Sequence, residues 1–193
     1  KLILMHLNSS IKQTISSIIS CVRNSSYDGH RSLIYHSVGS DVLGDPTGLN
    51  SLSKELFIEH VQLLREYKVV ESCSPNLNYN ELNISLTFDD GYTDNLLYAA
   101  PILVENKIPF TVFVTTDYIE NENSCMTKHQ LIELSKLSGV TIGSHTKSHP
   151  HLTKLNHFDL KKELDYSKFF IEDLIGLKVN SIAPLPAIGK GGI

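Results

Sequence analysis

The sequence predicts an α/β fold in which a parallel, barrel-like sheet is covered by helices, and three observations support this prediction. Short hydrophobic runs alternate along the chain with segments whose apolar residues recur every three or four positions. The hydrophobic runs are apolar on both faces, as expected of strands buried between helices. The 193 residues, 41% hydrophobic and 20% charged, are enough to bury one substantial core.

The first 30 residues are expected to form a helical extension, and residues 31–193 the main domain. A stripe of apolar residues supports the helix, and turn-forming residues at 24–29 end it. The stripe consists of Ile11, Ile15, Ile18, Ile19 and Val22. A strand is predicted over residues 32–38, and a polar, glycine-rich loop over residues 39–53.

Each later element has a local signal. Ser53 is a suitable N-cap for a helix whose stripe includes Phe57 and Leu64. A strand over residues 82–88 precedes a helix over residues 96–104, in which Pro101 predicts a kink or a fresh start.

The second half continues the alternation. The β-branched and aromatic run 110–115 predicts a strand. Thr127 and Gln130 have the spacing of a capping box at the start of a helix. The remaining predictions are a strand at 140–144, a helix at 158–175 closed by Gly176, and a strand at 179–183.

Composition excludes some classes of partner. The net charge of -4 and the pI near 6.1 give no electrostatic reason to expect a nucleic acid or an anionic membrane surface. Cys21, Cys73 and Cys125 are too few and too widely spaced for a disulfide framework or a CxxC metal pair. Polar residues interrupt the apolar runs among the first twenty residues, so no signal peptide or membrane span is visible and a cytoplasmic location is favoured.

The strongest chemical signal is a pair of carboxylates at the end of one predicted strand and a pair of histidines after another. Asp89 and Asp90 leave the strand in opposite directions, so one could hold a metal while the other faces a water molecule. His145 and His149 are four residues apart and can bind one ion. We prefer His149 to its competitor His151, because the following proline should hold it extended. Alone, either pair is more often an ordinary polar turn or surface chemistry.

Two segments resemble known motifs. Leu86–Tyr92 (LTFDDGY) and His145–Pro150 (HTKSHP) resemble the first two motifs of the polysaccharide deacetylase family, carbohydrate esterase family four, which includes chitooligosaccharide deacetylases. Ser32–Val38 resembles the opening strand of the subgroup that contains poly-N-acetylglucosamine deacetylases. The resemblance covers approximately residues 32–185 and leaves residues 1–30 outside it.

The resemblance implies a distorted β/α barrel and a set of roles. By it, Asp89 is the catalytic base, and Asp90, His145 and His149 hold a divalent metal, usually Zn²⁺, with Co²⁺ or Ni²⁺ as alternatives. The implied partner is an acetylated amino-sugar polymer or oligomer, from which water releases acetate. Tyr92 and His36 are candidates for substrate binding, although His36 is equally a candidate for a core histidine.

The chain departs from the family towards its end. The third motif usually contains an arginine or an aromatic residue, and residues 181–187 contain neither. The histidine that acts as general acid in the family would lie beyond Ile193, so we expect an incomplete barrel and an activity impaired by truncation. Three functions stay open: removal of N-acetyl groups from N-acetylglucosamine-containing glycans, O-acetyl esterase activity on xylan, and a non-catalytic metal- or glycan-binding remnant.

Overall fold

Four parallel strands form the central sheet in the order β1-β4-β5-β6. They are β1 (Gly29–Tyr35), β4 (Leu82–Phe88), β5 (Phe110–Val114) and β6 (Val140–Ser144). The computed structural model describes residues 29–185 except 41, 43, 44, 46, 47, 49, 73, 75, 76, 79 and 123. The α/β class with a parallel sheet is confirmed, and residues 1–28 of the predicted extension lie outside the described residues.

The first predicted strand differs from the structure at both ends. β1 begins at Gly29, because Gly29–Tyr35 pairs residue for residue with Leu82–Phe88. It ends at Tyr35, and Ser37–Val38 form a separate strand, β2, which pairs with β3 (Ser51–Leu52). β3 lies within the segment predicted to be a loop, because a two-residue strand surrounded by turn formers has no periodicity of its own.

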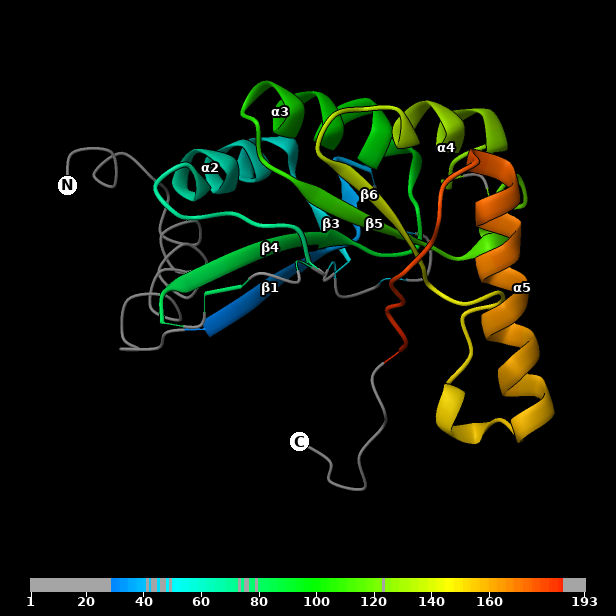
Figure 1. Cartoon of the computed structure of the whole chain (residues 1–193). Helices are drawn as coiled ribbons and strands as arrows, with labels where there is room; N and C mark the ends of the chain where they lie inside the picture. Colours follow the sequence, from blue (N-terminus) through cyan, green and yellow to red (C-terminus); the bar gives the residue numbers. More distant parts are fainter. Residues whose placement is uncertain are drawn as a thin grey trace.

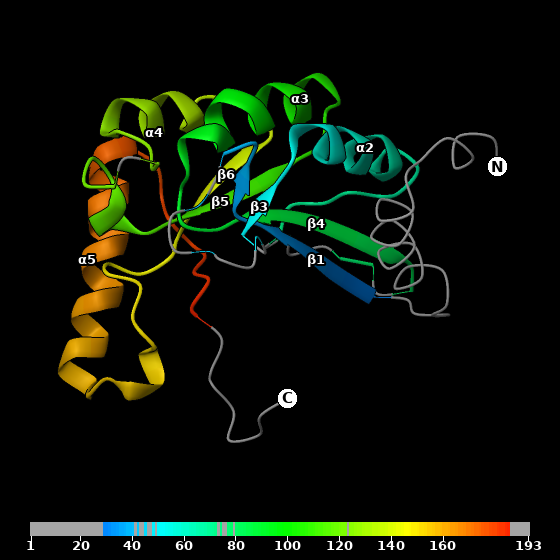
Figure 2. The same ribbon diagram turned by 180° about the vertical axis from the view of Figure 1, so that it is seen from behind.

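Three helices cover one face of the sheet, and a fourth stands beside β6 (Figures 1 and 2). The covering helices are α2 (Lys54–Leu64), α3 (Ala100–Glu105) and α4 (Lys128–Ser135), and α5 (His157–Ile175) is the fourth. The predicted caps are confirmed. The Ser53 hydroxyl accepts the N–H of Leu56 at 3.2 Å, and Thr127 and Gln130 form both bonds of the capping box.

Two backbone features confirm predicted interruptions. Pro101 lies in the first turn of α3, directly after the π-helical segment η2 (Asn95–Ala99); the backbone stays helical through Ala99 and Ala100, so the interruption is a change from π- to α-helical bonding. Gly176 ends α5 with a φ of 71°, a left-handed conformation that glycine adopts without steric cost. Among the described helices, none is both long enough and apolar enough to cross a membrane.

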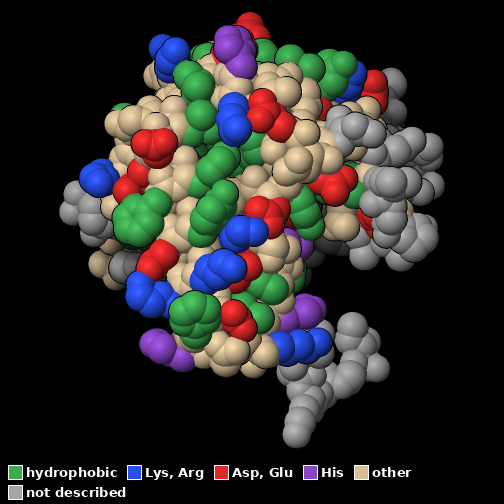
Figure 3. Space-filling view, turned by 90° about the vertical axis from the view of Figure 1, so that its right-hand side faces the viewer, with side chains coloured by type: hydrophobic (Ala, Val, Ile, Leu, Met, Phe, Trp, Pro, Cys, Tyr) green, Lys and Arg blue, Asp and Glu red, His purple; other side chains and the backbone are tan. Residues whose placement is uncertain are grey.

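The face that carries α5 mixes hydrophobic, lysine and acidic side chains (Figure 3).

The last predicted strand, 179–183, forms only a short pairing with β6. Ile182 bridges Ser144, the Ser144 N–H donates to the Ser181 carbonyl at 3.0 Å, and the Ala183 N–H donates back to Ser144. Val179 cannot extend the ladder, because its N–H donates to Glu172 and its carbonyl accepts from Lys168, both on α5. The prediction of a regular strand here was wrong.

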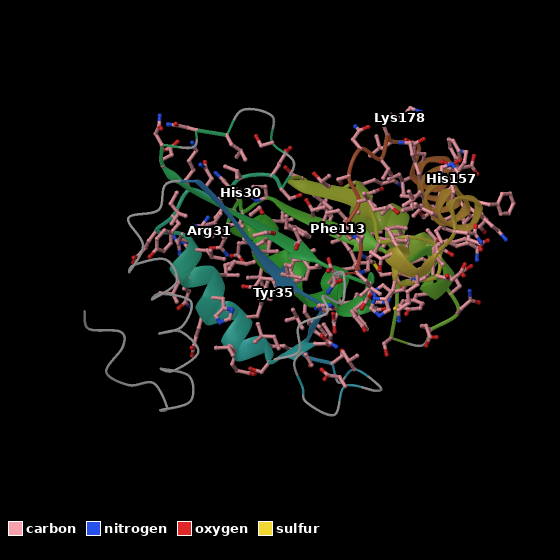
Figure 4. The ribbon with its side chains drawn as sticks, turned by 90° about the horizontal axis from the view of Figure 1, so that it is seen from below. His30, Arg31, Tyr35, Phe113, His157 and Lys178 are labelled. Atoms are coloured by element: carbon pink, nitrogen blue, oxygen red, sulfur yellow. The ribbon has the colours of Figure 1, made fainter. Side chains whose placement is uncertain are left out.

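Aromatic rings join the sheet to the helices at the point where β4 ends. The fully buried Phe88 ring lies 5.4 Å from Tyr35, 6.0 Å from Phe57 and 5.7 Å from Phe110, measured between ring centroids. Figure 4 shows β1 along the sheet edge, with His30 and Arg31 near its start and Tyr35 near its end. This packing fixes the position from which Asp89 and Asp90 leave the sheet.

We expect Phe88→Ala to lower the free energy of unfolding by about 3–5 kcal/mol, because it leaves a cavity in the core. Denaturant unfolding measures this loss. The control is Phe158→Ala, which removes a ring that is 76% exposed and should change stability by less than about 0.5 kcal/mol. Equal effects of the two substitutions would contradict the assignment of Phe88 to the core.

Candidate functional site

The predicted site residues lie together at the carboxyl ends of the strands. Asp89 directly follows β4, and its N–H donates to the Tyr35 carbonyl of β1 at 2.9 Å. His145 directly follows β6, and its N–H donates to the Val114 carbonyl of β5 at 2.9 Å. The parallel register therefore brings residues more than fifty positions apart to one edge of the sheet, where ligands bind in folds of this class.

Asp90, His145 and His149 form a cluster with the geometry of a metal site. One ligand atom from each lies within 4.8 Å of the others. The Asp90 Oδ1 atom lies 3.7 Å from His145 Nε2 and 3.5 Å from His149 Nε2, and the two Nε2 atoms are 3.0 Å apart. Ligand atoms around a tetrahedral ion with bonds near 2.0 Å are roughly 3.3 Å apart. Within the described part of the chain, no other such group was found.

The hydrogen bonding of the cluster also fits a cation. Asp90 is 6% exposed, and its Oδ1 atom is buried without a hydrogen-bond partner among the described residues. A buried carboxylate oxygen without a partner is costly unless a positive charge lies beside it. The oxygen and the two imidazole nitrogens are donors suited to Zn²⁺ or a related divalent ion.

The protonation of His145 leaves its ligand atom free. Its Nδ1–H donates to the backbone carbonyl of Ala183 in a short hydrogen bond, so the lone pair resides on Nε2. His149 Nδ1 lies 3.5 Å from the Tyr118 hydroxyl. Burial lowers the pKa of both histidines, which favours the neutral imidazole that metals require.

The backbone around the cluster is strained at three residues. Asp90, Thr146 and His149 have φ values of 73°, 71° and 61°, in the left-handed region that residues with a Cβ rarely adopt. The expectation that Pro150 holds His149 extended was therefore wrong. The His149 N–H donates to the Thr146 hydroxyl at 3.1 Å, and this turn directs the imidazole back towards His145. Such strain persists only where the surrounding contacts enforce it.

Asp89 lies beside the cluster and has a different environment. Its Oδ2 atom is 4.0 Å from His145 Nε2, and its side chain is 13% exposed. Burial raises the pKa of Asp89 to about 6, an effect that the charge of His36 opposes and the charge of Asp90 reinforces. Asp90 thus belongs to the cluster and Asp89 lies beside it, a division of the two carboxylates that the sequence pattern predicted.

The two candidate substrate-binding residues border these carboxylates. His36 follows β1, is partly exposed, and accepts a hydrogen bond from Asn95 on its carbonyl at 2.7 Å. Tyr92 is 9% exposed, and burial together with the neighbouring Asp90 carboxylate raises the pKa of its hydroxyl. His151, the competing ligand, is not part of the cluster.

Sequence reasoning missed two partners of the histidines. The Ala183 carbonyl is a backbone group, so no sequence signal could identify it. Tyr118 lies in the short 3₁₀ helix η3 (Thr116–Tyr118), just past the end of β5. Its place at a strand end was the signal that could have found it.

Comparisons with known proteins agree with this geometry. The chain is 29% identical to YxkH of Bacillus subtilis, a protein assigned to the polysaccharide deacetylases, over 152 residues that cover 74% of this chain and 51% of YxkH. It is 28% identical to chitin deacetylase 1 of Cryptococcus neoformans over 120 residues, which cover 62% of this chain and 23% of that protein. The chain thus spans about half the length of the first of these relatives, and less of the second.

Solved structures share the fold. The deacetylase PplD of Streptococcus pyogenes, solved in complex with acetate, has a TM-score of 0.70 at 22% identity, covering 86% of this chain and 77% of that one. The polysaccharide deacetylase BC0361 of Bacillus cereus has a TM-score of 0.69 at 22% identity, covering 81% and 50%. A sequence profile described as polysaccharide deacetylase matches residues 77–186, which include all four residues of the predicted metal site and base. The chain belongs to the polysaccharide deacetylase family.

Proposed function

We propose that this chain is a metal-dependent hydrolase that removes N-acetyl groups from poly- or oligosaccharides containing N-acetylglucosamine. The observation that carries the proposal is the unpartnered Asp90 oxygen facing two neutral imidazoles, with a second carboxylate of raised pKa beside them. Family membership and the similarity to a fungal chitin deacetylase support an acetylated glycan as substrate.

Asp90, His145 and His149 would hold the ion, which we propose to be Zn²⁺; Co²⁺ and Ni²⁺ accept the same donors. A divalent ion here supplies Lewis acidity towards a carbonyl oxygen and lowers the pKa of water. The Ala183 carbonyl would keep the His145 ring in the required tautomer and orientation. The Tyr118 hydroxyl, 3.5 Å from His149 Nδ1, would orient the His149 ring in the same way.

Asp89 would accept a proton from the attacking water. It lies close to the cluster without belonging to it, so its carboxylate stays free for proton transfer. A pKa of about 6 makes this carboxylate a stronger base than an ordinary aspartate while leaving it mainly ionised at neutral pH. Tyr92 and His36 border this side of the site, and we propose that they contact the substrate.

The proposed ligands predict stoichiometric metal binding. We expect the protein to bind one equivalent of Zn²⁺, and we expect His145→Ala and Asp90→Ala to weaken binding at least 10-fold, because each removes a ligand. Calorimetric titration of metal-free protein measures the dissociation constants. His151→Ala is the matched control and should bind as the wild type does. A wild type without stoichiometric metal, or a His145 variant with unchanged affinity, would contradict the proposed site.

The proposed function also predicts which acetylated glycan is turned over. Acetate release should be faster from N-acetylglucosamine oligomers than from acetylated xylan. Asp89→Asn should lower kcat by about 10²- to 10⁴-fold with little change in Zn²⁺ affinity, because it removes the base and leaves the ligands. A reversed substrate preference would favour the O-acetyl esterase. Metal binding without acetate release from either substrate would favour a non-catalytic remnant, and a fully active Asp89→Asn would refute the role of Asp89.

A further inference from the structure

The loop between the two metal-site histidines has an unfavourable conformation that other elements must hold. Thr146 and His149 are both left-handed within four residues of each other. Some backbone N–H groups of this loop bond to nearby residues: the Thr146 N–H donates to the Ser144 hydroxyl at 3.1 Å. The N–H groups of Lys147 and Ser148, which lie between the histidines, bond to a distant residue instead.

That residue is Glu163, in the second turn of α5. One carboxylate oxygen, Oε2, accepts the N–H of Lys147 at 3.0 Å and the N–H of Ser148 at 2.8 Å. The other oxygen, Oε1, accepts the Ser148 hydroxyl at 2.8 Å. Three hydrogen bonds thus converge on one carboxylate, and bonds to an ionised acceptor are roughly twice as strong as neutral ones.

The opposite side of the loop is bonded to η3. The Asp117 carboxylate pairs with the Lys147 ammonium at 2.6 Å, and the Asp117 N–H donates to the Lys147 carbonyl at 2.9 Å. The Thr116 N–H donates to the Thr146 carbonyl at 3.3 Å. The loop is therefore held between η3 and α5. Among the described residues of α5, Glu163 provides the side-chain hydrogen bonds to the loop, and the Tyr166 ring centroid lies 5.2 Å from the Lys147 ammonium.

We infer that Glu163 is a positioning residue that holds the 145–149 loop so that both imidazoles face Asp90. This inference rests on the proposed metal site and adds to it a residue from outside both sequence motifs. The hydrogen bonds of Glu163 go to the N–H groups of Lys147 and Ser148, the two residues before His149, and to the Ser148 hydroxyl. Without it, the left-handed turn would relax and the His149 Nε2 atom would leave the cluster.

The test compares Zn²⁺ affinity and amide exchange among variants of the full chain. Glu163→Ala should weaken Zn²⁺ binding about 10-fold or more, a loss typical of residues that orient metal ligands. Glu163→Gln keeps the shape and one acceptor oxygen but not the charge, so its affinity should lie between those of Ala and wild type. In the metal-free protein, hydrogen exchange at Lys147 and Ser148 should accelerate in Glu163→Ala.

Asp165→Ala is the matched control, because Asp165 lies on the same helix and forms its ion pair with Lys161, outside the 145–149 loop. It should retain wild-type affinity and exchange. Overturning results are wild-type affinity in both Glu163 variants, or unchanged exchange at the two amides. If Glu163→Ala does not fold, Glu163→Gln with wild-type affinity and exchange overturns the inference. A wild-type chain that binds no Zn²⁺ instead overturns the proposed function, and the metal role of Glu163 with it.

Discussion

The burial of the Asp90 carboxylate without a hydrogen-bond partner on Oδ1 is the feature on which the rest of the site depends. The Oδ1 atom is buried opposite two imidazole nitrogens and has no hydrogen-bond partner among the described residues. Burying such a charge is unfavourable by several kcal/mol or more unless a cation or a donor offsets it. Because the His145 Nδ1–H donates to the Ala183 carbonyl, the His145 Nε2 atom presents a lone pair towards Asp90 and adds no compensating donor. A divalent cation satisfies all three groups at once.

The sheet places Asp90 and the histidine loop close together, because both follow the carboxyl ends of parallel strands. The aromatic core around Phe88 fixes the end of β4, and the register of β5 with β6 fixes the start of the histidine loop. Among the described helices, α2, α3 and α4 cover one face of the sheet (Figures 1 and 2), and the site residues follow the carboxyl ends of β4 and β6. A rigid scaffold of this kind can hold strained residues such as Asp90 and His149, because the surrounding packing offsets their cost.

Residues from separate elements contact the proposed metal ligands and the loop between them. The Ala183 carbonyl contacts His145 from the segment after α5, which is itself held by Glu172 and Lys168. Tyr118 reaches His149 from η3, and Glu163 reaches the connecting loop from α5. Three parts of the fold that are distant in sequence thus act on two side chains. Such orientation would lower the entropy lost on metal binding, because the ligand atoms are already held close together.

Most of the helices and the four strands of the central sheet could be predicted from the sequence, as could the residues of the candidate site, whereas β2, β3 and the short pairing at Ile182 could not. The local signals of the sequence, such as the Ser53 cap, the Thr127 capping box and Gly176, depend on neighbours within a few positions, so they could be interpreted without a structure. The same holds for the two motifs that carry Asp89, Asp90, His145 and His149. Only the tertiary structure decided the left-handed turn at His149, the short pairing at Ile182, and the contacts of Ala183 and Glu163. These depend on hydrogen bonds between residues far apart in the chain, and no local propensity encodes such bonds.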